Sequence, residues 1–147
     1  MIIYTSYFAK LKFLPKNVIP ISICSKIPDW YKGAQYKKLA PKYDFFMKWK
    51  ETHDNDYYIK CFNEEVLANL IPHHVYDDLF DIAEDFVNEL PENDIRKQHQ
   101  KLKFPYVIAL ICYEKPDDFC HRHLVSDWLN KQGIKCKEYN FNEKNKT

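Results

Sequence analysis

The segment from Cys112 to His123 carries thiols, imidazoles, a carboxylate and a guanidinium within a short stretch of chain. A thiol in the first turn of a helix, beside a histidine, can ionise below its usual range and act as a nucleophile. A nearby carboxylate can donate and accept protons in the same reaction. The segment therefore predicts a catalytic set made of Glu114, Cys120, His121 and Arg122.

Arg122 is one of two arginines in a chain whose Lys and Arg total is 22. A guanidinium grips a phosphate or carboxylate with two parallel hydrogen bonds, which a lysine cannot do. A helix that begins near Cys120 also points free N–H groups and a positive dipole at such an anion. We predict that Arg122 and this helix N-terminus hold an anion, that Glu114 is the acid/base group, and that Cys120 acts with His121.

Each of these residues also has a structural interpretation. Cys120, Leu124 and Trp128 follow one another at intervals of four, so the thiol can belong to a buried helical stripe. Arg122 can form a surface ion pair, and Glu114 can be a solvated turn residue.

A metal site is the third interpretation of the same segment. Its candidate ligands are Cys112, Cys120, His121 and His123, but their spacing matches no standard zinc pattern. Adjacent helical residues also point about 100° apart. The sequence therefore predicts neither a metal nor a cofactor.

Hydrophobic patterning supplies the elements that position these residues. Residues 106–112 form a continuous apolar run, as in a central strand of a parallel sheet that is covered on both faces. Apolar patterns and turn signals predict further strands and helices. The expected strands are 2–7, 18–24, 106–112 and 134–139, and the expected helices are 63–71, 75–90 and 119–132, with Gly133 closing the last helix.

The remaining segments complete a single α/β domain over residues 1–139, followed by a polar tail, 140–147. We expect a long aromatic loop with one or two helical turns at 28–50, and a charged linker at 91–104. Strands that alternate with helices predict a mostly parallel sheet with flanking helices, in a Rossmann-like three-layer arrangement.

In open α/β sheets, ligands bind outside the carboxyl ends of the strands. Thr5 and Ser6 end the first expected strand and would share that edge with Glu114. We therefore predict a substrate pocket there, in which Trp30 and Tyr31 stack on a base. The predicted substrate-binding residues are Thr5, Ser6, Trp30, Tyr31 and Lys115.

Residues 28–50 interleave aromatic rings with lysines, a pattern suited to stacking bases and tracking the backbone of single-stranded nucleic acid. The simpler interpretation is a loop that packs its rings on the core and keeps its lysines in water. The expected helix 75–90 has an acidic side that could meet a basic partner. A nucleic-acid or protein-binding module without catalysis is thus the alternative to an enzyme.

Composition excludes several classes. The chain has only two glycines, Gly33 and Gly133, too few for a glycine-rich phosphate-binding loop. Its five cysteines are an odd number at irregular spacings, which fits reduced thiols. No apolar run reaches the ~18 residues of a membrane span, and the first residues lack the pattern of a secretion signal. We therefore expect a cytoplasmic protein with no membrane partner.

The chain resembles the bacterial and phage family named domain of unknown function 488 (DUF488). The likeness covers nearly the whole chain, and its most specific part is the apolar strand followed by Cys112-x-Glu114-Lys115 and then Cys120-His121-Arg122. The supporting parts are Thr5-Ser6-Tyr7 and Leu39-Ala40-Pro41. The resemblance implies a compact α/β domain whose signature residues cluster at one edge of the sheet, but it implies no particular reaction.

The functional prediction is a small enzyme, a hydrolase or transferase, with a site built from Glu114 and the Cys-His-Arg triplet. Its substrate would bear a phosphate, as a nucleotide or a single-stranded nucleic acid does, and would bind at the carboxyl edge of the sheet. The sequence does not predict an oligomeric state.

Overall fold

Short strands alternate with helices along the chain of this computed structural model, which describes residues 2–101 and 107–142. The described elements, in chain order, are β1 (Ile3–Tyr7), the 3-10 helix η1 (Phe8–Phe13), β2 (Val18–Ser22), β3 (Ala34–Gln35), η2 (Lys37–Leu39), α1 (Tyr43–Thr52), α2 (Asn55–Glu65), η3 (Leu67–Asn69), α3 (Pro72–Asn88), α4 (Ile95–Lys101), β4 (Val107–Cys112), α5 (His121–Lys131) and β5 (Cys136–Glu138).

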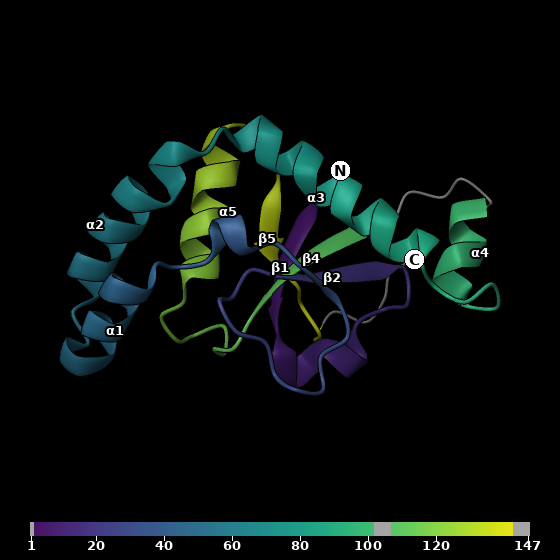
Figure 1. Ribbon diagram of the computed structural model, residues 1–147, viewed down its shortest axis with the longest axis horizontal. Helices are drawn as coiled ribbons and strands as arrows, with labels where there is room; N and C mark the ends of the chain where they lie inside the picture. The colour runs from purple at the N-terminus through teal and green to yellow at the C-terminus, as the bar shows by residue number, and fades with distance from the viewer. Residues whose placement is uncertain (1, 102–106, 143–147) are drawn as a thin grey trace.

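The described strands form one parallel sheet in the order β3-β2-β4-β1-β5. In the register, Ile19 of β2 and Ile3 of β1 both pair with Ile108 of β4, which therefore lies between them. All strands point the same way, so their carboxyl ends open on one edge (Figure 1). The predicted α/β fold with a parallel sheet and flanking helices is confirmed.

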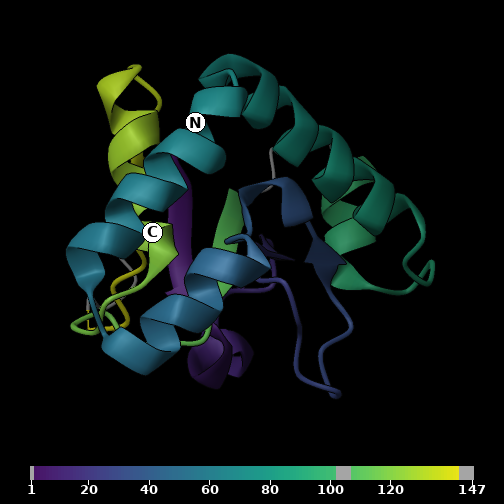
Figure 2. The same cartoon turned by 60° about the vertical axis from the view of Figure 1, so that its left-hand side comes forward.

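The core is built around β4, whose residues from Ile108 to Cys112 are at most 1% exposed. Burial of successive residues means that both faces of this strand are covered, as its apolar run predicts. Helix α3 packs on β2, β3 and β4, whereas α5 packs on β1, β4 and β5. Figures 1 and 2 show η1 on the opposite side of the molecule from α3. Among the described residues, no helix combines the length and the apolar character needed to cross a membrane.

The long helix and the last helix follow their sequence signals closely. Helix α3 begins at Pro72, which occupies the first turn where a missing N–H costs nothing. Its buried positions, Val75, Leu79, Ala83 and Val87, recur at helical spacing and leave the acidic side in water. Helix α5 is closed by Gly133, whose φ of +78° is readily adopted only by glycine.

The helix predicted at 63–71 is wrong, and so is the extent of the predicted loop at 28–50. Two antiparallel helices, α1 and α2, pack against each other in this region, and a tight turn joins them (Figure 2). His53, with a left-handed φ of 53°, ends α1. The side chain of Asp54 then accepts a hydrogen bond from the Tyr57 N–H at 3.1 Å and starts α2 at Asn55.

The linker predicted at 91–104 contains a helix, α4, so this prediction is also wrong over residues 95–101. Asp94 caps that helix, because its side chain accepts a hydrogen bond from the Arg96 N–H at 2.9 Å. Lys97 then reaches back to the carbonyl oxygens of Asn88 and Leu90, at 2.8 and 3.0 Å. Residues 102–106, including the predicted strand start at Tyr106, and residues 143–147 of the predicted tail lie outside the described residues.

The burial of β4 predicts that its apolar side chains dominate the stability of the fold. Ile111 is 0% exposed and Ile95 is 51% exposed, so the same substitution can be compared in both settings. Ile111→Ala should lower the free energy of unfolding in urea by about 3 kcal/mol, because it removes buried methylene groups and leaves a cavity. Ile95→Ala should change it by less than about 0.5 kcal/mol. Equal losses in the two variants would contradict this account of the core.

Candidate functional site

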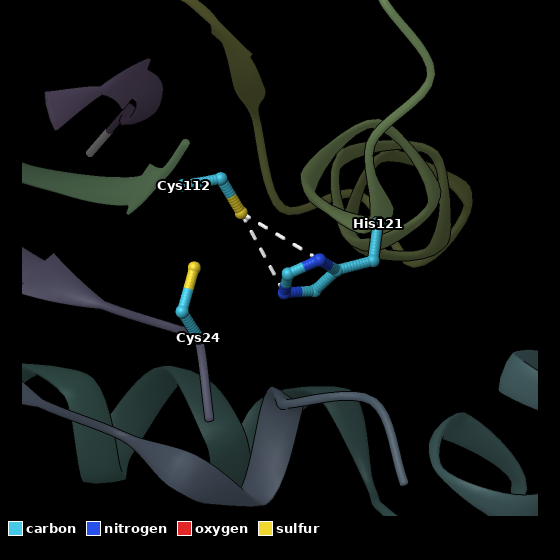
Figure 3. Close-up of side chains that lie close together, drawn as sticks. All are labelled: Cys24, Cys112 and His121. Atoms are coloured by element: carbon cyan, nitrogen blue, oxygen red, sulfur yellow. Dashed lines mark hydrogen bonds between the residues drawn. The ribbon is translucent and has the colours of Figure 1, made fainter. Parts of the chain in front are cut away.

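Three thiols and an imidazole meet at the carboxyl edge of the sheet. Cys112 ends β4, and Cys24 follows the neighbouring strand β2. Cys120 lies at the N-cap position of α5, and His121 is the first residue of that helix. Figure 3 shows Cys24, Cys112 and His121 pointing toward one another from three different elements. All four residues are buried.

The ring of His121 is oriented by the backbone. Its Nε2 lies 2.8 Å from the carbonyl oxygen of Ile23. A carbonyl oxygen only accepts, so Nε2 carries a proton and donates. Nδ1 lies 3.6 Å from the Cys112 Sγ and 4.0 Å from the Cys120 Sγ. The Cys112 Sγ also lies 3.5 Å from Nε2, so it is about equally far from both ring nitrogens, and Nδ1 is the one that can exchange a proton or bind a ligand.

The short distances between these groups shift their pKa values in different directions. The hydrogen bond from the Cys112 thiol, together with His121, holds the pKa of Cys120 well below its ordinary value despite burial. Burial, and hydrogen bonds to Cys120 and Cys24, raise the pKa of Cys112. Burial acts to lower the pKa of His121, but its hydrogen bond to Cys120 and the charge of that sulfur outweigh burial and raise it. The arrangement favours a Cys120 thiolate beside a protonated His121.

A pocket of about 480 Å³ opens directly above this cluster. The cluster of Cys24, Cys112, Cys120 and His121 lines it, together with Ser25, Lys26, Pro41, Tyr43, Phe46, Met47, Trp49, Lys50, Tyr58, Tyr113, Glu114 and Phe119. Glu114 is half-buried, and burial, followed by the nearby Cys120, raises the pKa of its carboxyl group. Three predicted catalytic residues, Glu114, Cys120 and His121, thus line one pocket.

Arg122, the fourth, is fully buried and does not line this pocket. Its Nε and Nη2 donate to the two carboxylate oxygens of Glu138, at 3.0 and 3.1 Å. Its Nη1 donates to the backbone carbonyl oxygen of Glu114, at 2.7 Å. The guanidinium therefore ties α5 to β5 and to the turn after β4, and its predicted role as an anion ligand stays a prediction.

The predicted substrate-binding residues do not gather at the pocket. Thr5 is buried and donates to Glu138 Oε1 at 2.6 Å, on the side of Arg122. Ser6 is fully buried, and its hydroxyl has no hydrogen-bond partner among the described residues. None of the five predicted residues, Thr5, Ser6, Trp30, Tyr31 and Lys115, lines the pocket.

The two aromatic residues of that set differ in exposure. Tyr31 is buried, and its hydroxyl donates to the carbonyl oxygens of Pro20 and Ala34 at 3.2 and 2.7 Å. Trp30 is 59% exposed and packs edge-on against Phe8. Lys115 is exposed. Their substrate-binding roles stay predictions.

Sequence reasoning assigned no role to Cys24 and did not single out Phe119. The pocket rings of Phe46 and Trp49 do belong to the stretch 28–50 that the sequence offered as a stacking surface for nucleic acid. Cys24 follows a strand that becomes a neighbour of β4 only once the sheet has formed. The usable signal was its place just beyond an apolar strand, the same place that Glu114 has after β4. Trp49 and Phe119 come from distant segments, yet their ring centroids lie 5.5 Å apart.

The buried ion pair predicts a difference between the two arginines. Arg122→Met should lower the free energy of unfolding by about 3–5 kcal/mol, because it leaves the Glu138 carboxylate without its partner. Arg96, whose side chain is 25% exposed and paired with Asp94, is the matched control. Arg96→Met should cost no more than about 1 kcal/mol. Urea denaturation measures both, and similar losses would contradict a structural role for Arg122.

Comparison with known proteins identifies the family of the chain. No match to the chain is found among curated proteins or among solved structures. A family model described as DUF488-N3a, the active DUF488-N3 subclade, matches residues 14–133. The match includes the signature segment from Cys112 to Arg122 and most of the described fold. The chain therefore belongs to the DUF488 family, in its DUF488-N3a subclade.

Proposed function

We propose that the protein is an enzyme that binds a phosphate-bearing molecule with a flat ring, such as a nucleotide or the end of a nucleic acid strand. The observation that carries this proposal is the pocket at the carboxyl edge, which combines an aromatic wall with a nucleophilic sulfur and a carboxyl group. A site of a few hundred Å³ with few polar groups is typical of small-molecule binding. The family description of the subclade as active is consistent with catalysis.

The aromatic wall suits a flat ring. Phe46 and Trp49 are stacked with an interplanar angle of 30°, and Trp49 and Phe119 are inclined by 35°. Stacking of a nucleobase on such rings does not depend on its hydrogen-bonding pattern, because every base has a π-face. The wall therefore supports binding of a nucleobase without reading its identity.

Two lysines provide positive charge around the same pocket. Lys26 and Lys50 are both exposed and both line it, and the Lys50 Nζ lies 4.9 Å from the centre of the Phe46 ring. An exposed ammonium group attracts a phosphate while it keeps contact with water. These lysines supply the phosphate contact that Arg122, which is committed to Glu138, does not offer in this structure.

The proposed chemistry is nucleophilic group transfer. The Cys120 thiolate bonds to an electrophilic atom of the substrate, and the bond to the leaving group breaks, with its electron pair passing to that group. Glu114, whose pKa is raised by burial, gives a proton from its carboxyl group to the leaving group. Water or another hydroxyl compound then attacks the thio-linked intermediate and loses its proton to Glu114, and Cys120 leaves as the thiolate. A hydrolase or a transferase results, depending on the acceptor.

The five cysteines support a reducing compartment, and we place the protein in the cytoplasm on that ground. All five are free thiols in the structure, and three of them meet at the site. A nucleophilic thiol next to two others stays reduced only in a compartment that keeps cysteines from forming disulfides.

Cys120→Ser tests the proposed nucleophile. The purified protein is incubated with nucleoside mono-, di- and triphosphates and with 5′-phosphorylated single-stranded oligonucleotides, and products are separated by liquid chromatography and mass spectrometry. We expect turnover of one class and a loss of at least about 100-fold in Cys120→Ser, since a serine hydroxyl is a far weaker nucleophile.

Cys61→Ser is the matched control, because Cys61 lies on α2 and does not line the pocket. It should keep full activity. Turnover that survives in Cys120→Ser would remove the nucleophile from the proposal. Oligonucleotide binding without turnover of any compound would instead favour a binding module.

The pocket also predicts which tryptophan contacts the ring of the substrate. Trp49→Leu should weaken substrate binding by about 1–3 kcal/mol, or roughly 5- to 150-fold, through the loss of a stacking surface. Trp30→Leu should leave it unchanged, because Trp30 does not line the pocket. Fluorescence titration with the substrate found above measures both, and a larger effect of Trp30 would place the ring site at Trp30 and Tyr31, as predicted from the sequence.

A further inference from the structure

Cys24, Cys112 and His121 form a cluster that the proposed reaction does not explain. Each offers one ligand atom, these atoms all lie within 4.8 Å of one another, and all three residues are buried. The proposed reaction assigns no role to Cys24 or Cys112. We propose that these three side chains bind a zinc ion at the floor of the pocket.

The spacing of the ligand atoms suits tetrahedral zinc. Bond lengths of about 2.3 Å to sulfur and 2.0–2.1 Å to nitrogen place a sulfur and a nitrogen ligand about 3.6 Å apart. The Cys112 Sγ lies 3.6 Å from the His121 Nδ1 and 3.5 Å from its Nε2, so the ring must turn for Nδ1 to point at a shared metal. Small side-chain rotations suffice to bring the remaining pairs, already within 4.8 Å, to a common centre.

The histidine is oriented as zinc-binding histidines are. Its Nε2 donates to the Ile23 carbonyl oxygen at 2.8 Å, which leaves Nδ1 as the ligand atom. Such a hydrogen bond on the far ring nitrogen fixes the orientation of a metal-binding imidazole and raises its basicity. The ring also packs against Phe62, with the centroids 5.6 Å apart, so its position is held on a second side.

Two thiolates and a neutral imidazole select zinc among the common divalent ions, since magnesium and calcium prefer oxygen ligands. The charges also balance, because two thiolates neutralise the ion and leave no net charge in a buried place. The sequence offers Cys112 and His121 as candidate ligands but not Cys24, which follows β2 and reaches the other two only through the pairing of β2 with β4. His123 does not belong to it, although the sequence offers His123 as a ligand beside His121.

Three protein ligands leave the fourth position open toward the pocket, which all three of them line. An open position is typical of zinc sites that take part in reactions, whereas structural sites have four protein ligands. Cys120 is not one of the three ligands, so its sulfur does not take up the fourth position. Zinc binding itself does not depend on the role proposed for Cys120.

The test is zinc binding by the full chain under reducing conditions, with metal content measured by mass spectrometry and Co²⁺ used as an optical probe. We expect about one zinc ion per chain, and a Co²⁺ spectrum with the sulfur-to-metal absorption of a tetrahedral thiolate site that disappears when zinc is added. Cys24→Ser and Cys112→Ser should each weaken binding by at least about tenfold, because loss of a ligand costs more than loss of an outer partner.

Cys61→Ser and Cys136→Ser are the matched controls, since both remove a thiol outside the cluster, and both should keep the metal. Cys120→Ser should keep it as well, and loss of zinc in that variant would overturn the open fourth position. A wild-type chain that binds no zinc, or whose Co²⁺ spectrum lacks thiolate absorption, would overturn the site even if Cys24→Ser fails to fold. Zinc binding without turnover of any nucleotide would leave this inference standing and reject only the proposed function.

Discussion

The burial of one positive charge constrains the whole carboxyl edge of the sheet. Arg122 is fully buried and reaches both oxygens of Glu138 and the carbonyl oxygen of Glu114. A buried charge is tolerated only when it is paired and its hydrogen bonds are satisfied, so the three groups cannot move independently. Thr5 adds a further hydrogen bond to Glu138. Strands β1 and β5, the turn after β4 and the start of α5 are therefore locked together through one guanidinium.

These hydrogen bonds of Arg122 explain why adjacent residues of the Cys-His-Arg triplet point to different parts of the structure. Successive residues on a helix point about 100° apart, so once Arg122 is directed to Glu138 its neighbour must point elsewhere. His121 accordingly turns toward Cys112 and Cys24, where Ile23 holds its ring. Cys120, in extended backbone just before the helix, faces the same pocket. The Cys-His-Arg triplet thus supplies a thiol, the imidazole beside it and the guanidinium that positions both.

The sequence predicted the parts of the fold whose signals are local. The apolar run of β4, the acidic and apolar sides of α3 and the glycine after α5 each depend on a few neighbouring residues, and each was found. The paired helices α1 and α2 were missed because their boundary rests on a left-handed His53 and on the capping side chain of Asp54, between segments without a clean apolar period. Tertiary packing of Phe45 on Tyr58 and Phe62 stabilises that pair instead.

The same difference between local signals and tertiary packing applies to the candidate site. Glu114, Cys120 and His121 were identified because they lie within one short segment that follows a strong strand. Trp49 was part of the aromatic stretch 28–50 that the sequence offered as a nucleic-acid surface. Cys24 was given no role, because only the parallel pairing of β2 with β4 brings it to the site.

Cys24 also affects the ionisation of the clustered thiols at this edge of the sheet. A hydrogen bond from Cys112 lowers the pKa of the Cys24 thiol, although burial acts to raise it. Cys112 has one proton, and the hydrogen bonds that lower the pKa of Cys24 and of Cys120 both come from it. The proposed zinc ion would remove this competition, because the thiolates of Cys24 and Cys112 would compensate its charge while His121 binds in its neutral form. The third thiol is therefore the residue on which the proposed zinc site depends.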